Sequence, residues 1–78
     1  MKRPAVKELE ALPKSDRQRI ARKIRGLADD PRPAGSEKLS GQEKYRLRQG
    51  TYRILYQIDD AARLVTVVKI AHRRDAYR

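Results

Sequence analysis

The sequence predicts an α+β fold, in which two N-terminal helices pack on one face of a small antiparallel β-sheet. Three observations support this prediction. Apolar residues recur at helical spacing between residues 5 and 28, apolar and polar residues alternate from residue 44 to residue 58, and a β-branched apolar run occupies residues 64–71. The chain has 78 residues, and we expect one domain, residues 1–78, near the lower size limit for folding on a single core.

The first helix is predicted over residues 3–12, because apolar side chains recur there at i, i+4 and i+7 and Pro13 stops the pattern. Ser15 and Gln18 have the spacing of a capping box, which predicts the start of the second helix. Asp29-Asp30-Pro31 ends that helix. Its outer surface collects five cations, which are Arg17, Arg19, Arg22, Lys23 and Arg25. We expect most of them to be solvated, with an acidic partner helix as the main alternative.

Residues 44–58 are predicted to form a β-hairpin, around which the sheet is organised. Apolar and polar residues alternate on both sides of Gln49-Gly50, and a two-residue loop there keeps the apolar residues of both strands on one face. This loop sets Arg46 opposite Arg53. The predicted core face consists of Tyr45, Leu47, Tyr52, Ile54, Tyr56 and Ile58.

The other face of the hairpin collects three guanidinium groups, those of Arg46, Arg48 and Arg53, and we call it the arginine face. Like charges opposite each other in a sheet are destabilising, so this face favours a site that an anion occupies. A solvated basic surface is the alternative. Residues 30–37 are predicted as a loop that crosses from the helices to the sheet, and residues 64–71 as a well-covered strand.

The charge and the residue types limit the possible functions. Twenty Lys and Arg against ten Asp and Glu give a net charge of +10, which is typical of proteins that meet polyanions such as nucleic acid or an acidic protein. The chain has no cysteine and one histidine, so we expect no disulfide framework, no metal site and no other cofactor. No apolar run has the length of a membrane span, and no signal peptide is recognisable. We expect a soluble, cytoplasmic protein without a membrane partner.

The polar residues of the predicted sheet and tail suit cleavage of RNA without a metal. A Ser-His-Asp triad and a P-loop are both missing. The tail, which we expect to curl over the arginine face, adds His72, Arg73, Arg74 and Tyr77. Arginines can bind phosphate and neutralise a phosphorane, an imidazole can exchange a proton near neutral pH, and a tyrosine can stack on a base or donate a proton. The alternatives are a surface histidine and a tyrosine that packs against the domain.

Four motifs together resemble the RelE branch of the RelE/ParE toxin superfamily. They are Lys38-Leu39-Ser40-Gly41, Tyr45-Arg46-Leu47-Arg48, Gly50-x-Tyr52-Arg53-Ile54-x-Tyr56-x-Ile58 and His72-Arg73-x-x-x-Tyr77. The resemblance runs from about Pro4 to Arg78 and is most specific in the sheet half. It implies the toxin of a type II toxin–antitoxin system, which enters the ribosomal A site, contacts mRNA and ribosomal RNA, and cuts the mRNA without a metal. It also implies a RelB-like antitoxin as partner.

The resemblance and the charge pattern together give candidate roles to the site residues. The candidate catalytic residues are Arg53, Arg73, Tyr77 and His72. The candidate RNA-binding residues are Arg46, Arg48 and Arg74. RelE itself has lysines in place of Arg46 and Arg48, one of them assigned to proton transfer. Because arginine hardly deprotonates, that role would move to His72 or Tyr77.

A second departure from the family lies at the N-terminus. Family members begin with a β-strand before the first helix, and Met1-Lys2-Arg3 is too short to supply one. We therefore expect either a truncated start or a version of the fold without this strand, which leaves a sheet edge open to a partner. Two other functions stay open: a ParE-like inhibitor of DNA gyrase that cuts nothing, and a small basic nucleic-acid-binding protein without catalysis. The tail with His72, Arg73 and Tyr77 favours the nuclease.

Overall fold

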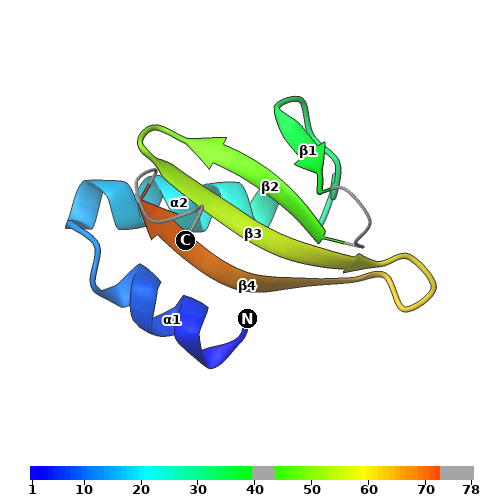
Figure 1. Ribbon diagram of the computed structural model, residues 1–78, viewed down its shortest axis with the longest axis horizontal. Coiled ribbons are helices and arrows are strands. Elements are labelled where there is room, and N and C mark those ends of the chain that lie inside the picture. The colour runs from blue at the N-terminus through cyan, green and yellow to red at the C-terminus, as the bar shows by residue number, and fades with distance from the viewer. Residues whose placement is uncertain (40–43, 73–78) are drawn as a thin grey trace.

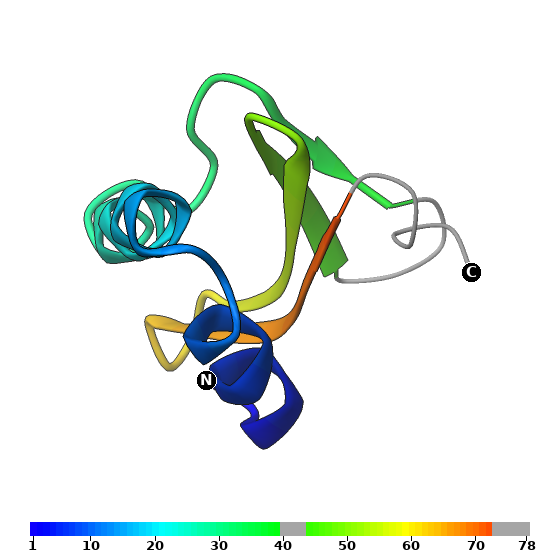
Figure 2. The same ribbon diagram turned by 90° about the vertical axis from the view of Figure 1, so that its left-hand side faces the viewer.

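The structure, a computed structural model, describes residues 1–39 and 44–72. Two helices, α1 (Arg3–Glu10) and α2 (Lys14–Gly26), precede a four-stranded antiparallel sheet with the strand order β1-β2-β3-β4. The strands are β1 (Ser36–Lys38), β2 (Lys44–Gln49), β3 (Tyr52–Asp59) and β4 (Leu64–His72). Both helices lie on one side of the sheet, and α1 runs beside β4 (Figure 1 and Figure 2). The predicted fold class is confirmed.

The core lies between the helices and one face of the sheet, as the alternation in the sequence predicts. Its buried members are Ala5, Ile20, Leu27, Tyr45, Leu47, Ile54, Tyr56, Val67 and Ile70. A β-bulge shifts the register of β3 and β4 between Leu55 and Tyr56 and makes Val68 the extra residue of β4. Because of this bulge, Val67 and Ile70, which are three positions apart, both face the core.

The second helix starts two residues earlier than predicted, with Pro13 in the N-cap position that was predicted for Ser15, and without a capping box. Pro13 is its N-cap residue, no side-chain cap is present, and the Arg17 N–H donates to the Pro13 carbonyl oxygen at 2.9 Å. Ser15 therefore lies inside the first turn, and the prediction that it caps the helix is wrong. The extended backbone of Pro13 (φ −54°, ψ 149°) leads directly into the helix. Neither helix of the described chain is long and apolar enough to cross a membrane.

The β2–β3 hairpin has a two-residue loop, but the loop lies one residue later than predicted, at Gly50 and Thr51. Gly50 has a φ of +59°, and a hairpin turn of type II′ requires such an angle at its first position, where glycine is preferred. Arg53 consequently pairs with Arg48 and not with Arg46. Since the register shifts by two residues, every side chain keeps its predicted face.

The N-terminal segment covers part of the β4 edge, whereas we expected a sheet edge to be open. The backbone N–H of Lys2 donates to the carbonyl oxygen of Val67 at 2.9 Å. The carboxylate of Glu8 accepts hydrogen bonds from the Ile70 N–H at 3.0 Å and from the Lys69 ammonium at 3.1 Å. In the described residues no strand precedes α1, so this helix takes the place of an edge strand and satisfies backbone groups that a strand would pair.

Candidate functional site

Strand alternation places the arginine face on the side of the sheet away from both helices. Arg46 and Arg48 alternate on β2 with the core residues Tyr45 and Leu47, and Arg53 lies opposite Arg48 on β3. The three arginines differ in exposure: Arg48 is exposed, the Arg46 side chain is 20% exposed, and Arg53 is 5% exposed.

Arg53 is therefore buried, which does not fit the alternative of a solvated basic surface at this residue. It lies on the central strand pair between Arg48 of β2 and Ala71 of β4, so neighbouring strands flank it on both sides. Its Nε and Nη1 atoms are shielded from solvent. Because burial limits screening by water, the positive charge of this guanidinium acts strongly on nearby groups.

Glu37, which the sequence did not single out, joins the arginine face from β1. It pairs with Arg46 in the β1–β2 register, and its carboxylate forms an ion pair with the Arg46 guanidinium. The hydrogen bond and charge of Arg46 lower the pKa of the Glu37 carboxyl, and the charges of Arg48 and Arg53 lower it further. The face thus has three guanidiniums and one ionised carboxylate. Ser36-Glu37-Lys38 has no apolar alternation, and the prediction of residues 30–37 as a loop is therefore wrong at Ser36 and Glu37.

His72 lies on the opposite side of the sheet from the arginine face. It pairs with Tyr52, and the two rings meet edge to face with centroids 5.6 Å apart. His72 follows the core residue Ile70 by two positions on β4, which gives both side chains the same face. The structure therefore does not bring His72 to the arginines, contrary to our expectation. Arg73, Arg74 and Tyr77 lie outside the described residues.

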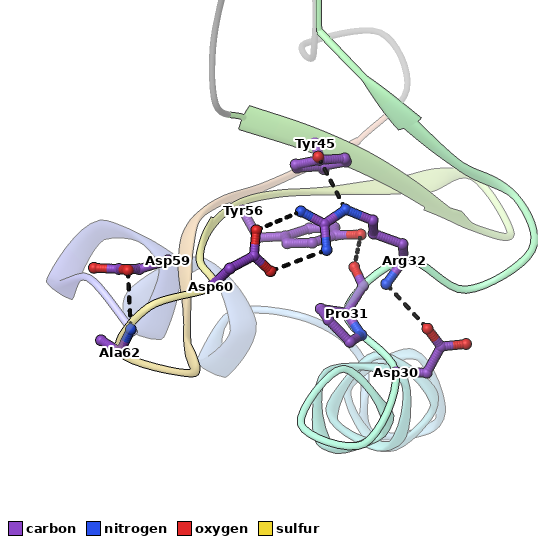
Figure 3. Close-up of polar contacts among 8 residues, drawn as sticks. All are labelled: Asp30, Pro31, Arg32, Tyr45, Tyr56, Asp59, Asp60 and Ala62. Carbon is purple, nitrogen blue, oxygen red and sulfur yellow. Dashed lines mark hydrogen bonds and ion pairs between the residues drawn. The ribbon is translucent and has the colours of Figure 1, made fainter.

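A cluster of polar and aromatic contacts, which we call the clamp, holds the segment that leads into β1 (Figure 3). Arg32 forms a two-pronged ion pair with Asp60 of the β3–β4 turn at 3.1 and 2.9 Å, and its Nε donates to the Tyr45 hydroxyl at 3.1 Å. The Tyr56 hydroxyl donates to the Pro31 carbonyl oxygen at 2.8 Å, and the rings of Tyr45 and Tyr56 stack with centroids 5.7 Å apart.

The clamp has electrostatic and structural consequences. The Arg32 guanidinium lowers the pKa of the Asp60 carboxyl by hydrogen bonding and charge, and burial raises the pKa of the Tyr56 phenol. Gly35, with a φ of +91°, then turns the chain into β1. The clamp and this turn together set the position of β1, and with it the position of Glu37.

The arrangement on the arginine face is suited to binding a phosphodiester. Guanidiniums bind phosphate oxygens in two-pronged geometry, and a carboxylate beside them can accept a proton. Among residues 1–39 and 44–72, no group of three His, Asp or Glu side chains is placed to hold a metal ion.

Comparison with known proteins gives consistent results. The model of the family described as the ParE toxin of the type II toxin–antitoxin system parDE matches residues 1–77. A RelE-like toxin protein of Escherichia coli is 33% identical over 72 residues, which are 88% of this chain and 75% of that protein. Toxin RelG of Mycobacterium tuberculosis is 47% identical over 34 residues, but the match spans only 44% of this chain and 39% of RelG.

A solved structure of a relative matches the fold. The archaeal RelE–RelB complex from Pyrococcus horikoshii superposes with a TM-score of 0.84 at 28% identity, over 96% of this chain and 92% of that chain. The resemblance noted in the sheet motifs is thereby confirmed. The chain belongs to the ParE toxin family of type II toxin–antitoxin systems, within the RelE/ParE superfamily.

Proposed function

We propose that this toxin is an mRNA endoribonuclease, which acts in the ribosomal A site and cleaves without a metal ion by attack of a ribose 2′-OH on the adjacent phosphate. The observation that supports the proposal is the ion pair between Glu37 and Arg46 on the arginine face. It provides a proton acceptor next to phosphate-binding groups. Arginine cannot supply that acceptor, because its pKa is too high.

Binding of the substrate begins at the exposed arginine. Arg48 contacts the scissile phosphate first, and Arg46 then exchanges the Glu37 carboxylate for a phosphate oxygen. The buried Arg53 adds a fixed charge that stabilises the phosphorane, in which negative charge develops. The phosphate offsets the charge of Arg46, so the pKa of Glu37 rises and its carboxylate becomes a better base once RNA is bound.

The reaction then needs two proton transfers. Glu37 accepts the 2′-OH proton while the bond between the 2′-oxygen and phosphorus forms. The bond between phosphorus and the 5′-oxygen breaks, and the 5′-oxygen takes a proton from the Tyr77 hydroxyl, which we propose as donor. Arg73 and Arg74 add positive charge at the phosphate. His72, which contacts Tyr52 on the other side of the sheet, has no proton-transfer role in this proposal.

The test uses programmed ribosomes, because a protein of this size needs the ribosome to hold the RNA in line for attack. Products with a 2′,3′-cyclic phosphate, or its hydrolysed form, and a 5′-OH are expected, with equal yield in EDTA. Products with a 5′-phosphate, or loss of cleavage in EDTA, would contradict the mechanism.

The proposed inhibitor is a RelB-like antitoxin, since the archaeal relative is found in a RelE–RelB complex. Action on the ribosome places the toxin in the cytoplasm. A second candidate function is inhibition of DNA gyrase, which the match to the ParE toxin model favours. Inhibition of gyrase supercoiling by the purified chain, with no mRNA cleavage on ribosomes, would establish that function instead.

A further inference from the structure

A groove of about 320 Å³ lies between α2 and the end of β2, and we call it the basic groove. Arg19, Arg22 and Lys23 line it from α2 at i, i+3 and i+4, so they share one face of the helix. Its other lining includes Gly26, Pro33 and Leu47, which contribute apolar or backbone surface.

The cations of the basic groove are available to an anion. All three are exposed, and within the described residues no carboxylate pairs with them and no hydrogen bond ties down their side chains. Like charges three and four positions apart weaken a helix, so this arrangement does not serve the stability of α2. An acidic ligand would relieve the repulsion.

Gly26 keeps the groove open at the end of the helix. Its φ is not positive, so the backbone does not require glycine there. A Cβ atom built on it has no neighbour within 4 Å, so packing does not require glycine either. Glycine also weakens a helix relative to alanine. The space at Gly26 is thus a feature that an incoming side chain can use.

The lining of the groove favours a peptide over a nucleic acid. It contains no aromatic side chain on which a base could stack. The half-buried Pro33 offers apolar surface to an aliphatic side chain above the buried Leu47, and the three cations suit carboxylates beside it. The groove also lies on the helix side of the sheet, because Leu47 alternates with Arg46 and Arg48 along β2. Its occupant therefore leaves the arginine face free.

We propose that the basic groove docks an acidic segment of a protein partner, with carboxylates on Arg19, Arg22 and Lys23 and an aliphatic side chain beside Gly26. The identification of this partner as the antitoxin rests on the proposed function; the preference for an acidic, partly apolar segment does not. Docking here and RNA binding on the arginine face occur on opposite sides of the sheet, so they are compatible.

The experiment measures binding of a short labelled peptide of glutamate and leucine to the full chain, with a glutamine-for-glutamate peptide as control. The variant Arg19→Gln/Arg22→Gln removes two groove cations, and the matched variant Arg17→Gln/Arg25→Gln removes two exposed α2 cations that do not line the groove. The groove variant should weaken binding about tenfold, and the matched variant less than about threefold. Gly26→Leu fills the open space and should weaken binding without lowering the melting temperature.

NMR amide shifts should locate the peptide on α2 and at Gln49, and a 2′-deoxy-substituted RNA oligonucleotide should not displace it. Equal losses in the two double variants would overturn the proposal, because binding would then follow overall charge. Displacement by the RNA would assign the groove to nucleic acid. Absence of mRNA cleavage by the wild-type chain would remove the proposed function and leave this docking result unaffected.

Discussion

Replacing Glu37 by glutamine should separate RNA binding from RNA cleavage. Glu37 forms an ion pair with Arg46, so it competes with the substrate phosphate for that guanidinium. With Glu37 ionised the three arginines and one carboxylate sum to a charge of +2 (3 − 1), and Glu37→Gln raises this to +3. The variant should therefore bind RNA more tightly while losing the proposed base.

The magnitudes follow from this charge count. One additional phosphate neutralised should steepen the slope of log K against log salt by about 0.7 for single-stranded RNA. At fixed salt the affinity for RNA should rise by up to about fivefold, the factor that corresponds to the strength of one exposed ion pair. Loss of a general base should slow cleavage by roughly 10²–10⁴-fold.

The assay pairs two measurements on each variant. Fluorescence anisotropy over a salt series gives the affinity and slope, with RNA that has 2′-deoxyribose at the scissile position. Single-turnover cleavage on programmed ribosomes gives the rate. Glu10→Gln is the matched control, since Glu10 is an exposed carboxylate of α1, on the helix side of the sheet. Cleavage by Glu37→Gln at the wild-type rate would refute its role as the base, and weaker RNA binding would refute the competition.

Three further predictions concern other residues. Arg53→Ala should abolish cleavage and also lower the free energy of unfolding by about 1–3 kcal/mol, because Arg53 is buried. The exposed Arg48 is the comparison, and Arg48→Ala should change the free energy of unfolding by less than about 0.5 kcal/mol. Urea melts in which both variants match wild type would contradict this prediction. The ion pair in the clamp lowers the pKa of Asp60, so the stability that this ion pair contributes is full above about pH 4 and is lost as pH falls through the lower folded-state pKa. Asp60→Asn should therefore reduce the loss of stability at acid pH in thermal melts. An unchanged pH profile would argue against the clamp. Tyr77→Phe should slow cleavage by about 10²–10⁴-fold, while His72→Gln should stay within about threefold of wild type; the reverse order would return the proton-transfer role to His72.

The faces of the hairpin could be predicted because side-chain alternation has a period of two. Moving the loop from Gln49-Gly50 to Gly50-Thr51 shifted the pairing by two residues, which changed the neighbour of Arg53 without changing its face. The loop position itself depends on a positive φ at Gly50, and the alternation contains no information about that angle.

The composition of the site was harder to predict, because it depends on short or irregular segments. Glu37 lies on a three-residue strand without an apolar pattern, and only pairing with β2 places it beside Arg46. The face of His72 depends on the bulge at Val68, which changes the alternation partway along β4. Arg32 and Asp60 are 28 residues apart, and no local pattern in the sequence links them.

The central claim is that the toxin cleaves RNA by 2′-OH attack on the arginine face. It is tested most directly by removing a single oxygen atom from the substrate. An mRNA with 2′-deoxyribose at the scissile position keeps every phosphate that the arginines bind but lacks the nucleophile. On programmed ribosomes the wild-type toxin should leave this mRNA intact while binding it as well as the all-ribose mRNA, which it should cleave. Cleavage of the deoxy-substituted site would contradict the account.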